Sequence, residues 1–220
     1  MPQDETPRIT MRRMSDYLTA AGAHQRLMII QSMKSRLGRR HFAPYYQAAR
    51  LAIRAHHGGD DQILETEIQR LLRERRDAIK PTDIARIENN LRVISDHRDQ
   101  FASEQMEHLS TRFAPLNLNG VRITVEPTLS GRLVVGKKVI EANVMVDTRS
   151  DRPDDDQIEY VLEMLHRGSG LTRPAPASGA QYWHPASGYA WSLNRASIRR
   201  WRDIEDAAHE IALRWPTIQV

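Results

Sequence analysis

The spacing of apolar residues changes at Pro115, and this change divides the chain into two kinds of secondary structure. Before it, apolar side chains recur every three or four residues, as over 84–94, which predicts amphipathic helices. After it, residues 121–125 alternate apolar and polar side chains, as a half-buried strand does. We therefore expect an α+β protein, with a basic helical region over 1–114 and a small mixed or antiparallel sheet flanked by helices over 115–220.

Turn and cap residues set the expected limits of the helices. Gly22 interrupts an apolar pattern that begins at Thr10, so we expect two helices before Leu37, a third over 45–57, and a fourth that Asp60 or Asp61 caps. The longest predicted helix begins at Thr82 and extends to Phe113. Its apolar positions at 84, 87, 91 and 94 are spaced as in a short coiled-coil seam. This seam either packs within the chain or forms a homodimer through residues 84–101.

The pattern over residues 115–220 predicts strands interrupted by one helix and a final helix after them. Residues 121–125, 133–135 and 139–146 predict a three-stranded antiparallel meander. Asp154 is a suitable N-cap for the helix that follows, and residues 181–193 predict a hairpin with aromatic pairs across it. Ser197 caps the final helix.

Positive charge is concentrated near the beginning of the sequence. Between Arg8 and His57, ten Arg and Lys residues stand against one acid, Asp16, whereas residues 58–220 carry a net charge of −3. Clustered cations release condensed counterions when they meet phosphates, so this asymmetry predicts a polyanionic partner.

Arginines and aromatic rings in this basic arm suit nucleic acid, because guanidinium groups bind phosphates and rings stack on bases. DNA and RNA are both compatible with it. Two alternatives stay open: an acidic protein partner on the same surface, or a solvated face that docks on the acidic remainder of the chain. The candidate contact residues are Arg12, Arg13, Arg26, Lys34, Arg36, Arg39, Arg40, Tyr45 and Tyr46.

Two acids after Pro115 suggest a metal-dependent reaction. Glu126-Pro127 ends one predicted strand, and Glu141-Ala142-Asn143 lies within another, with Glu141 and Asn143 on one face. Together with the order of predicted elements over residues 115–215, this pattern resembles a degenerate PD-(D/E)XK core of the restriction-endonuclease-like family. The resemblance implies that Glu126 and Glu141 hold Mg²⁺ and that Asn143 occupies the position of the water-orienting lysine.

The pattern departs from that family at two positions. Thr128 stands where the family has an aspartate, and Asn143 supplies no positive charge to stabilise a hydroxide. The resemblance therefore implies a catalytically degenerate, nuclease-like protein, similar to small proteins of bacterial mobile elements and defence systems. In the structural alternative, Glu126 and Glu141 face solvent and pair with Arg122, Lys137 or Lys138.

The remaining signals mostly exclude functions. The chain has no cysteine, which excludes thiolate chemistry and favours a cytoplasmic location, and it has neither a signal-peptide pattern nor a membrane-length apolar run. We expect His56 and His57 to act as charged C-caps of a helix, and His184 to pack in the core.

Taken together, the sequence predicts a nucleic-acid-binding protein that uses its basic N-terminal helices. The alternatives are a Mg²⁺-dependent nuclease with Glu126, Glu141 and Asn143 in the active site, and a non-catalytic subunit that binds an acidic protein.

Overall fold

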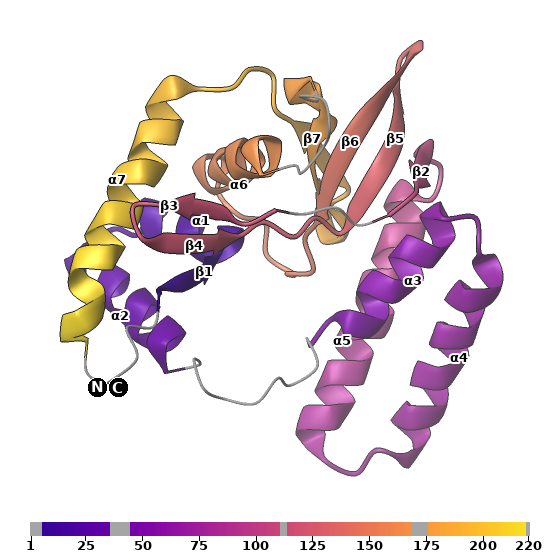
Figure 1. Ribbon diagram of the computed structural model, residues 1–220. Helices are drawn as coiled ribbons and strands as arrows, with labels where there is room; N and C mark the ends of the chain where they lie inside the picture. The colour runs from indigo at the N-terminus through magenta and orange to yellow at the C-terminus, as the bar shows by residue number, and fades with distance from the viewer. Residues whose placement is uncertain (1–5, 36–44, 111–113, 169–175, 219–220) are drawn as a thin grey trace.

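A five-stranded mixed sheet lies at the centre of the computed structural model, which describes residues 6–35, 45–110, 114–168 and 176–218 (Figure 1). Its strands are ordered β2-β5-β6-β7-β8. Only β6 and β7 are parallel, and helix α6 (Asp155–Arg167) connects them. The strands are β2 (Met106–His108), β5 (Leu129–Val135), β6 (Lys138–Val146), β7 (Ala180–His184) and β8 (Tyr189–Ser192).

A second, three-stranded sheet corrects the predicted meander. In it, β4 (Val121–Thr124) pairs in parallel with β1 (Arg8–Thr10) and antiparallel with β3 (Leu116–Leu118). Of the predicted meander, only β5 and β6 pair with one another, with Gly136 at the turn in the left-handed region (φ 62°). The hairpin predicted over 181–193 is confirmed by the antiparallel pair β7 and β8. The meander prediction was wrong because alternation shows which side chains of a strand are buried but not which strand lies beside it.

The helices confirm most of the predicted limits, since their caps are local features. Asp60 and Ser197 accept N-cap hydrogen bonds, and Asp154 forms a capping box. One limit was wrong: the long helix ends at Phe101, and the chain continues as β2 at the sheet edge. Besides α6, the helices are α1 (Met11–Thr19), α2 (Ala23–Lys34), α3 (Gln47–His57), α4 (Asp61–Asp77), α5 (Pro81–Phe101) and α7 (Ile198–Arg214).

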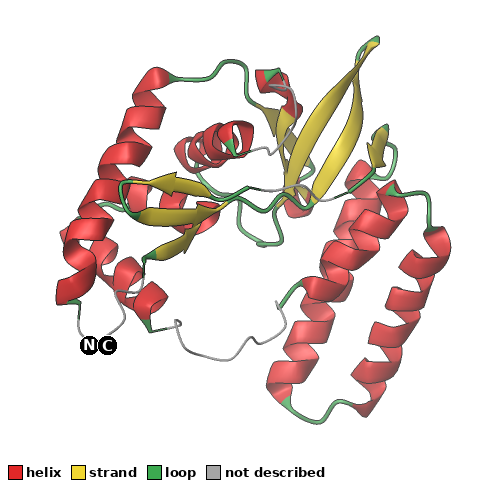
Figure 2. Cartoon of the chain, viewed as in Figure 1, coloured by secondary structure: helices red, strands yellow, loops and turns green. Residues whose placement is uncertain are grey.

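Two hydrophobic cores lie on opposite faces of the five-stranded sheet (Figure 2). Val144 and Val146 of β6 pack in the core that α3, α4 and α5 cover, whereas Met145 between them packs in the core formed with α1, α6 and α7. The structure is therefore α+β, as predicted, and 3₁₀ turns complete it at Ala177–Gly179, Pro185–Ser187 and Trp215–Thr217.

Several contacts cross the sequence boundary predicted between residues 114 and 115. Strand β1 pairs with β4, strand β2 pairs with β5, and α1 packs against both α6 and α7. The N-terminal β1–α2 segment thus belongs to the core of the second region, while α3 to α5 form a helical layer on the other side of the sheet (Figure 1).

The seam on α5 is used within the chain. Ile87 and Ile94 are buried in the core of α3, α4 and α5, and Leu91 packs against the same core. This confirms the predicted amphipathic helix, and the homodimer stays a prediction that these contacts do not support. Among the described residues, no helix is long and apolar enough to cross a membrane.

Candidate nucleic-acid interface

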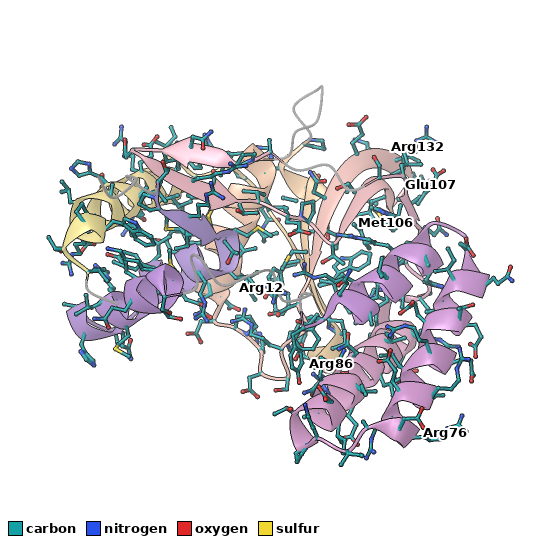
Figure 3. The ribbon with its side chains drawn as sticks, turned by 60° about the horizontal axis from the view of Figure 1, so that its bottom comes forward. Arg12, Arg76, Arg86, Met106, Glu107 and Arg132 are labelled. Carbon is teal, nitrogen blue, oxygen red and sulfur yellow. The ribbon has the colours of Figure 1, made fainter. Side chains whose placement is uncertain are left out.

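Three arginines come together where α1 meets α3. Arg12 projects from α1, and Arg50 and Arg54 lie one turn apart on α3. Figure 3 labels Arg12 near the middle of the molecule, between α1 and the helical layer. The charge of Arg12 contributes to lowering the pKa of Arg50, as expected for two cations near one another. We call Arg12, Arg50 and Arg54 the arginine cluster.

Arg50 is the least satisfied member of the arginine cluster. It forms an ion pair with Glu126 over 3.8 Å, too long for a hydrogen bond, and its buried Nε has no hydrogen-bond partner. Burial and the adjacent charge of Arg12 both lower the pKa of Arg50. The side chain therefore remains a cation with a shortage of acceptors.

The other two arginines are anchored to the protein. Arg54 donates to the backbone oxygens of Thr128 (2.8 Å) and Pro127 (3.4 Å), and burial lowers its pKa. Arg12 donates to the Val146 oxygen and pairs with the fully buried Asp147, both at 3.1 Å, while its Nε has no partner. These anchors hold both guanidinium groups beside Arg50.

Asp147 is the acid around which this region is organised. Burial alone would raise its pKa, but Arg12 and Arg149 together with the Tyr182 hydroxyl lower it below the ordinary value. Arg149 Nε lies 2.9 Å from the carboxylate, and Tyr182 donates to it. Asp147 is thus a fully paired structural anion.

Two tyrosines directly precede α3 in the chain. Tyr45 and Tyr46 pack edge to face, with ring centroids 4.8 Å apart. Asn89 donates to the Tyr45 hydroxyl (3.0 Å), and Asn90 donates to its backbone oxygen (2.8 Å), so α5 fixes the pair. The Tyr45 side chain is still 43% exposed, which leaves a ring surface open to a base.

Most other basic residues of the predicted arm are paired within the chain. Arg13 pairs with Asp16 on its own helix (3.5 Å), and Arg26 pairs with Glu210 on α7 (3.6 Å). Lys34 donates to the backbone oxygens of Trp215 and Ile218, both at 2.8 Å. These contacts agree with the alternative in which the arm docks on the rest of the chain.

Arg36, Arg39 and Arg40 lie outside the described residues. Of the candidate contact residues that the structure describes, Arg12 lies near Arg50 and Arg54, Tyr45 and Tyr46 directly precede α3, and the other three are paired as above. Arg50 and Arg54 were not among the predicted contact residues. In the sequence, Arg50 and Arg54 contributed only to the excess of positive charge. The spacing of Tyr46, Arg50 and Arg54 at four-residue intervals on one predicted helix is the signal that could have singled them out.

The residues of the predicted nuclease site lie apart. Glu126 pairs with Arg50 and, over 4.0 Å, with Arg54, instead of the Arg122, Lys137 or Lys138 of the structural alternative. Glu141 is exposed and lies opposite Arg132 in the β5–β6 register. Asn143 is buried and accepts a hydrogen bond from the Ser130 hydroxyl (2.5 Å).

The two acids also face different sides of the sheet. Ala142 and Val144 point into the core under α3, so Glu141 and Asn143 point to the other face. Glu126 is turned towards α3 itself. Within the described ranges, no group of three or more His, Asp or Glu side chains is placed to hold a metal ion. The Mg²⁺-dependent nuclease therefore stays a prediction to which this geometry lends no support.

A pocket of about 770 Å³ between α3, β2 and β5 is lined by His56 and His57 among other residues. Figure 3 labels Met106, Glu107 and Arg132 along it, and the last two form an ion pair (3.2 Å). His57 Nδ1 donates to the Met106 oxygen (3.2 Å), and its Nε2 lies 3.0 Å from His97 Nε2. Burial lowers the pKa of His57 to about 4, so the predicted charged C-cap is wrong for this residue.

Comparison with known proteins does not assign the chain to a family. No protein-family model matches the chain, and no curated protein is significantly similar to it. The resemblance to the restriction-endonuclease-like family is thus neither supported nor opposed.

Proposed function

We propose that the protein binds nucleic acid, with the arginine cluster as a phosphate contact and Tyr45 as a stacking surface. The observation that carries the proposal is the state of Arg50, a partly buried cation whose Nε has no acceptor and whose carboxylate partner is 3.8 Å away. The side chain is 23% exposed, and a phosphate that meets this exposed part would supply acceptors in charge-assisted hydrogen bonds. Arg12 and Arg54 would add two further charges to the same contact.

The sequence next to the arginine cluster fits this partner. Arg36, Arg39 and Arg40 precede Tyr45 by five to nine residues, so the chain carries three more cations close to the beginning of α3. The proposed interface consists of Tyr45 and the arginine cluster, together with these three residues by their place in the sequence. It involves binding alone and leaves open both the choice between DNA and RNA and the sequence preference.

The test is fluorescence anisotropy with single- and double-stranded DNA and RNA at about 50 mM and about 200 mM salt. We expect Arg50→Gln, and separately the triple change of Arg36, Arg39 and Arg40 to Ala, to weaken binding. Each lost phosphate contact lowers the slope of log affinity against log salt by about 0.9 on duplex DNA. Tyr45→Ala should weaken binding to single strands more than to duplexes.

Arg202→Gln is the matched control, because it removes one charge from an exposed position on α7. Circular dichroism confirms that each variant is folded. If the folded wild type binds none of the four nucleic acids, or if Arg50→Gln and the triple variant both behave like Arg202→Gln, the proposal is wrong.

A further inference from the structure

A pocket of about 330 Å³ lies between α1, α2, α6 and α7, on the opposite side of α1 from the arginine cluster. Three carboxylates line it from one face of α7: Asp203, Asp206 and Glu210. Arg26 is the one cation among its lining residues, which leaves the lining with a net charge of −2. The remaining walls are Tyr17, Leu18, Tyr160 and Ala207.

Some of these acidic groups are already paired, and the pairing shows which acceptors remain. Glu210 pairs with Arg214 (2.7 Å) and Arg26 (3.6 Å). The Tyr160 hydroxyl donates to one oxygen of Asp203 (2.9 Å). The exposed Asp206 takes part in none of these pairs. The second oxygen of Asp203 and both oxygens of Asp206 are thus the acceptors not used by these pairs.

Tyr17 gives an independent indication of a missing ligand. Its side chain is 1% exposed, and its hydroxyl lies beside the Glu210 carboxylate without completing a hydrogen bond of ordinary geometry. A buried hydroxyl that completes no hydrogen bond is unfavourable by about 1–3 kcal/mol, so one that lines a pocket indicates that a bound group could supply the missing contact. The negative surroundings agree: burial and the Glu210 carboxylate raise the pKa of Tyr17 to about 12, and burial and Asp203 raise that of Tyr160 to about 12.

We propose that this pocket binds a primary alkylammonium group. Such a group has three N–H donors and no acceptor, which match Asp203, Asp206 and the Tyr17 oxygen. Arg26 already lies over the Tyr17 ring, 5.5 Å from its centroid, so the Tyr160 ring is the one we assign to the ligand cation. Leu18 and Ala207 provide apolar contact for the attached methylene groups. The ammonium group belongs either to a free small amine or to a lysine side chain of a partner protein.

The experiment is isothermal titration calorimetry of the full-length protein with 1,4-diaminobutane and with an uncharged peptide that contains one lysine. Butan-1-ol and a matched salt concentration are the controls. We expect the amine to bind and the alcohol not to bind. Asp206→Asn should weaken the affinity for the amine by about tenfold or more, because it removes a charge-assisted hydrogen bond.

Tyr17→Phe separates a ligand contact from a structural role. Because the Tyr17 hydroxyl completes no hydrogen bond of ordinary geometry, its removal should cost the free protein little stability while it weakens amine binding. Glu205→Gln makes the same charge change on α7 outside the pocket and should have no effect. Binding of only the lysine peptide would identify a protein as the source of the ammonium group. Absence of binding by both probes, or binding that Asp206→Asn and Tyr17→Phe leave unchanged, would overturn the proposal.

Discussion

At the scale of single residues, the distinction between a binding cation and a structural one depends on its partners. Arg12 and Arg50 are equivalent in a sequence count of charge, yet Arg12 is tied to Asp147 and Arg50 has only the distant Glu126. These partners are more than seventy residues away along the chain. Composition therefore gave the excess of positive charge in this part of the sequence but could not say which of these residues remain available to a ligand.

Asp147→Asn should strongly destabilise the protein. The change leaves Arg12 and Arg149 without their shared buried anion, and the loss of one partner from a buried ion pair costs about 3–5 kcal/mol. Urea unfolding of the variant measures this loss. Tyr182→Phe, which removes one donor and keeps both arginines paired, should cost less. Equal and small effects of the two changes would contradict a central role for the Asp147 charge.

The buried His57–His97 pair should make stability decrease as the solution becomes acidic. Met106 accepts from His57 Nδ1, so His57 Nε2 must accept from His97, and both rings are neutral. Burial, together with the charges of neighbouring histidines, lowers the pKa of His57 to about 4 and of His97 to about 3. His56 and His108 are the other titratable neighbours.

Because the unfolded state of these histidines binds protons below about pH 6.5 and the folded state does not, their contribution is complete above that pH and decreases below it. Between pH 7 and pH 5, we expect each of the two histidines to lower the free energy of unfolding by about 2 kcal/mol. In His97→Phe the difference in unfolding free energy between these two pH values should shrink by about that amount. The exposed His24→Gln is the control. An unchanged pH dependence in His97→Phe would show that His97 is not held neutral.

At the scale of elements, local signals predicted the helices well, whereas the partners of strands could not be predicted. Asp60, Asp154 and Ser197 cap helices through hydrogen bonds that span three residues, so the sequence contains all the information. The partner of β4 is β1, which is more than one hundred residues away. The expected convergence of Glu126 and Glu141 depended on that incorrect pairing.

The seam of α5 should contribute to stability within one chain. Ile87 is 1% exposed among side chains of α3 and α4, so Ile87→Ala should cost about 2–4 kcal/mol in urea unfolding. Leu91→Lys should likewise destabilise the protein, and light scattering should give the mass of a monomer for the wild type. A wild-type dimer that Leu91→Lys converts to a stable, folded monomer would instead support the predicted homodimer.

At the scale of the whole molecule, residues 6–35 belong physically to the second half of the chain. Ile9, Met14 and Tyr17 are buried in the core that also contains Ile123 and Met145. Ion pairs such as Arg26–Glu210 join the same segments, so the positive charge near the beginning of the sequence partly neutralises acids near its end. The charge asymmetry of the sequence is therefore smaller in the folded surface than composition suggests.

This arrangement predicts that residues 115–220 alone will not fold. The fragment lacks β1 as a partner for β4 and lacks the α1 side chains that fill the core against α6 and α7. We expect it to give a disordered NMR spectrum, whereas the full chain unfolds in one transition in urea. Addition of a peptide covering residues 1–35 should restore dispersed signals in the fragment, because that peptide supplies the missing strand and helix. A fragment that folds cooperatively by itself would instead show that residue 115 begins an independent domain, and that the contacts of β1 and α1 add stability to a core that is already complete.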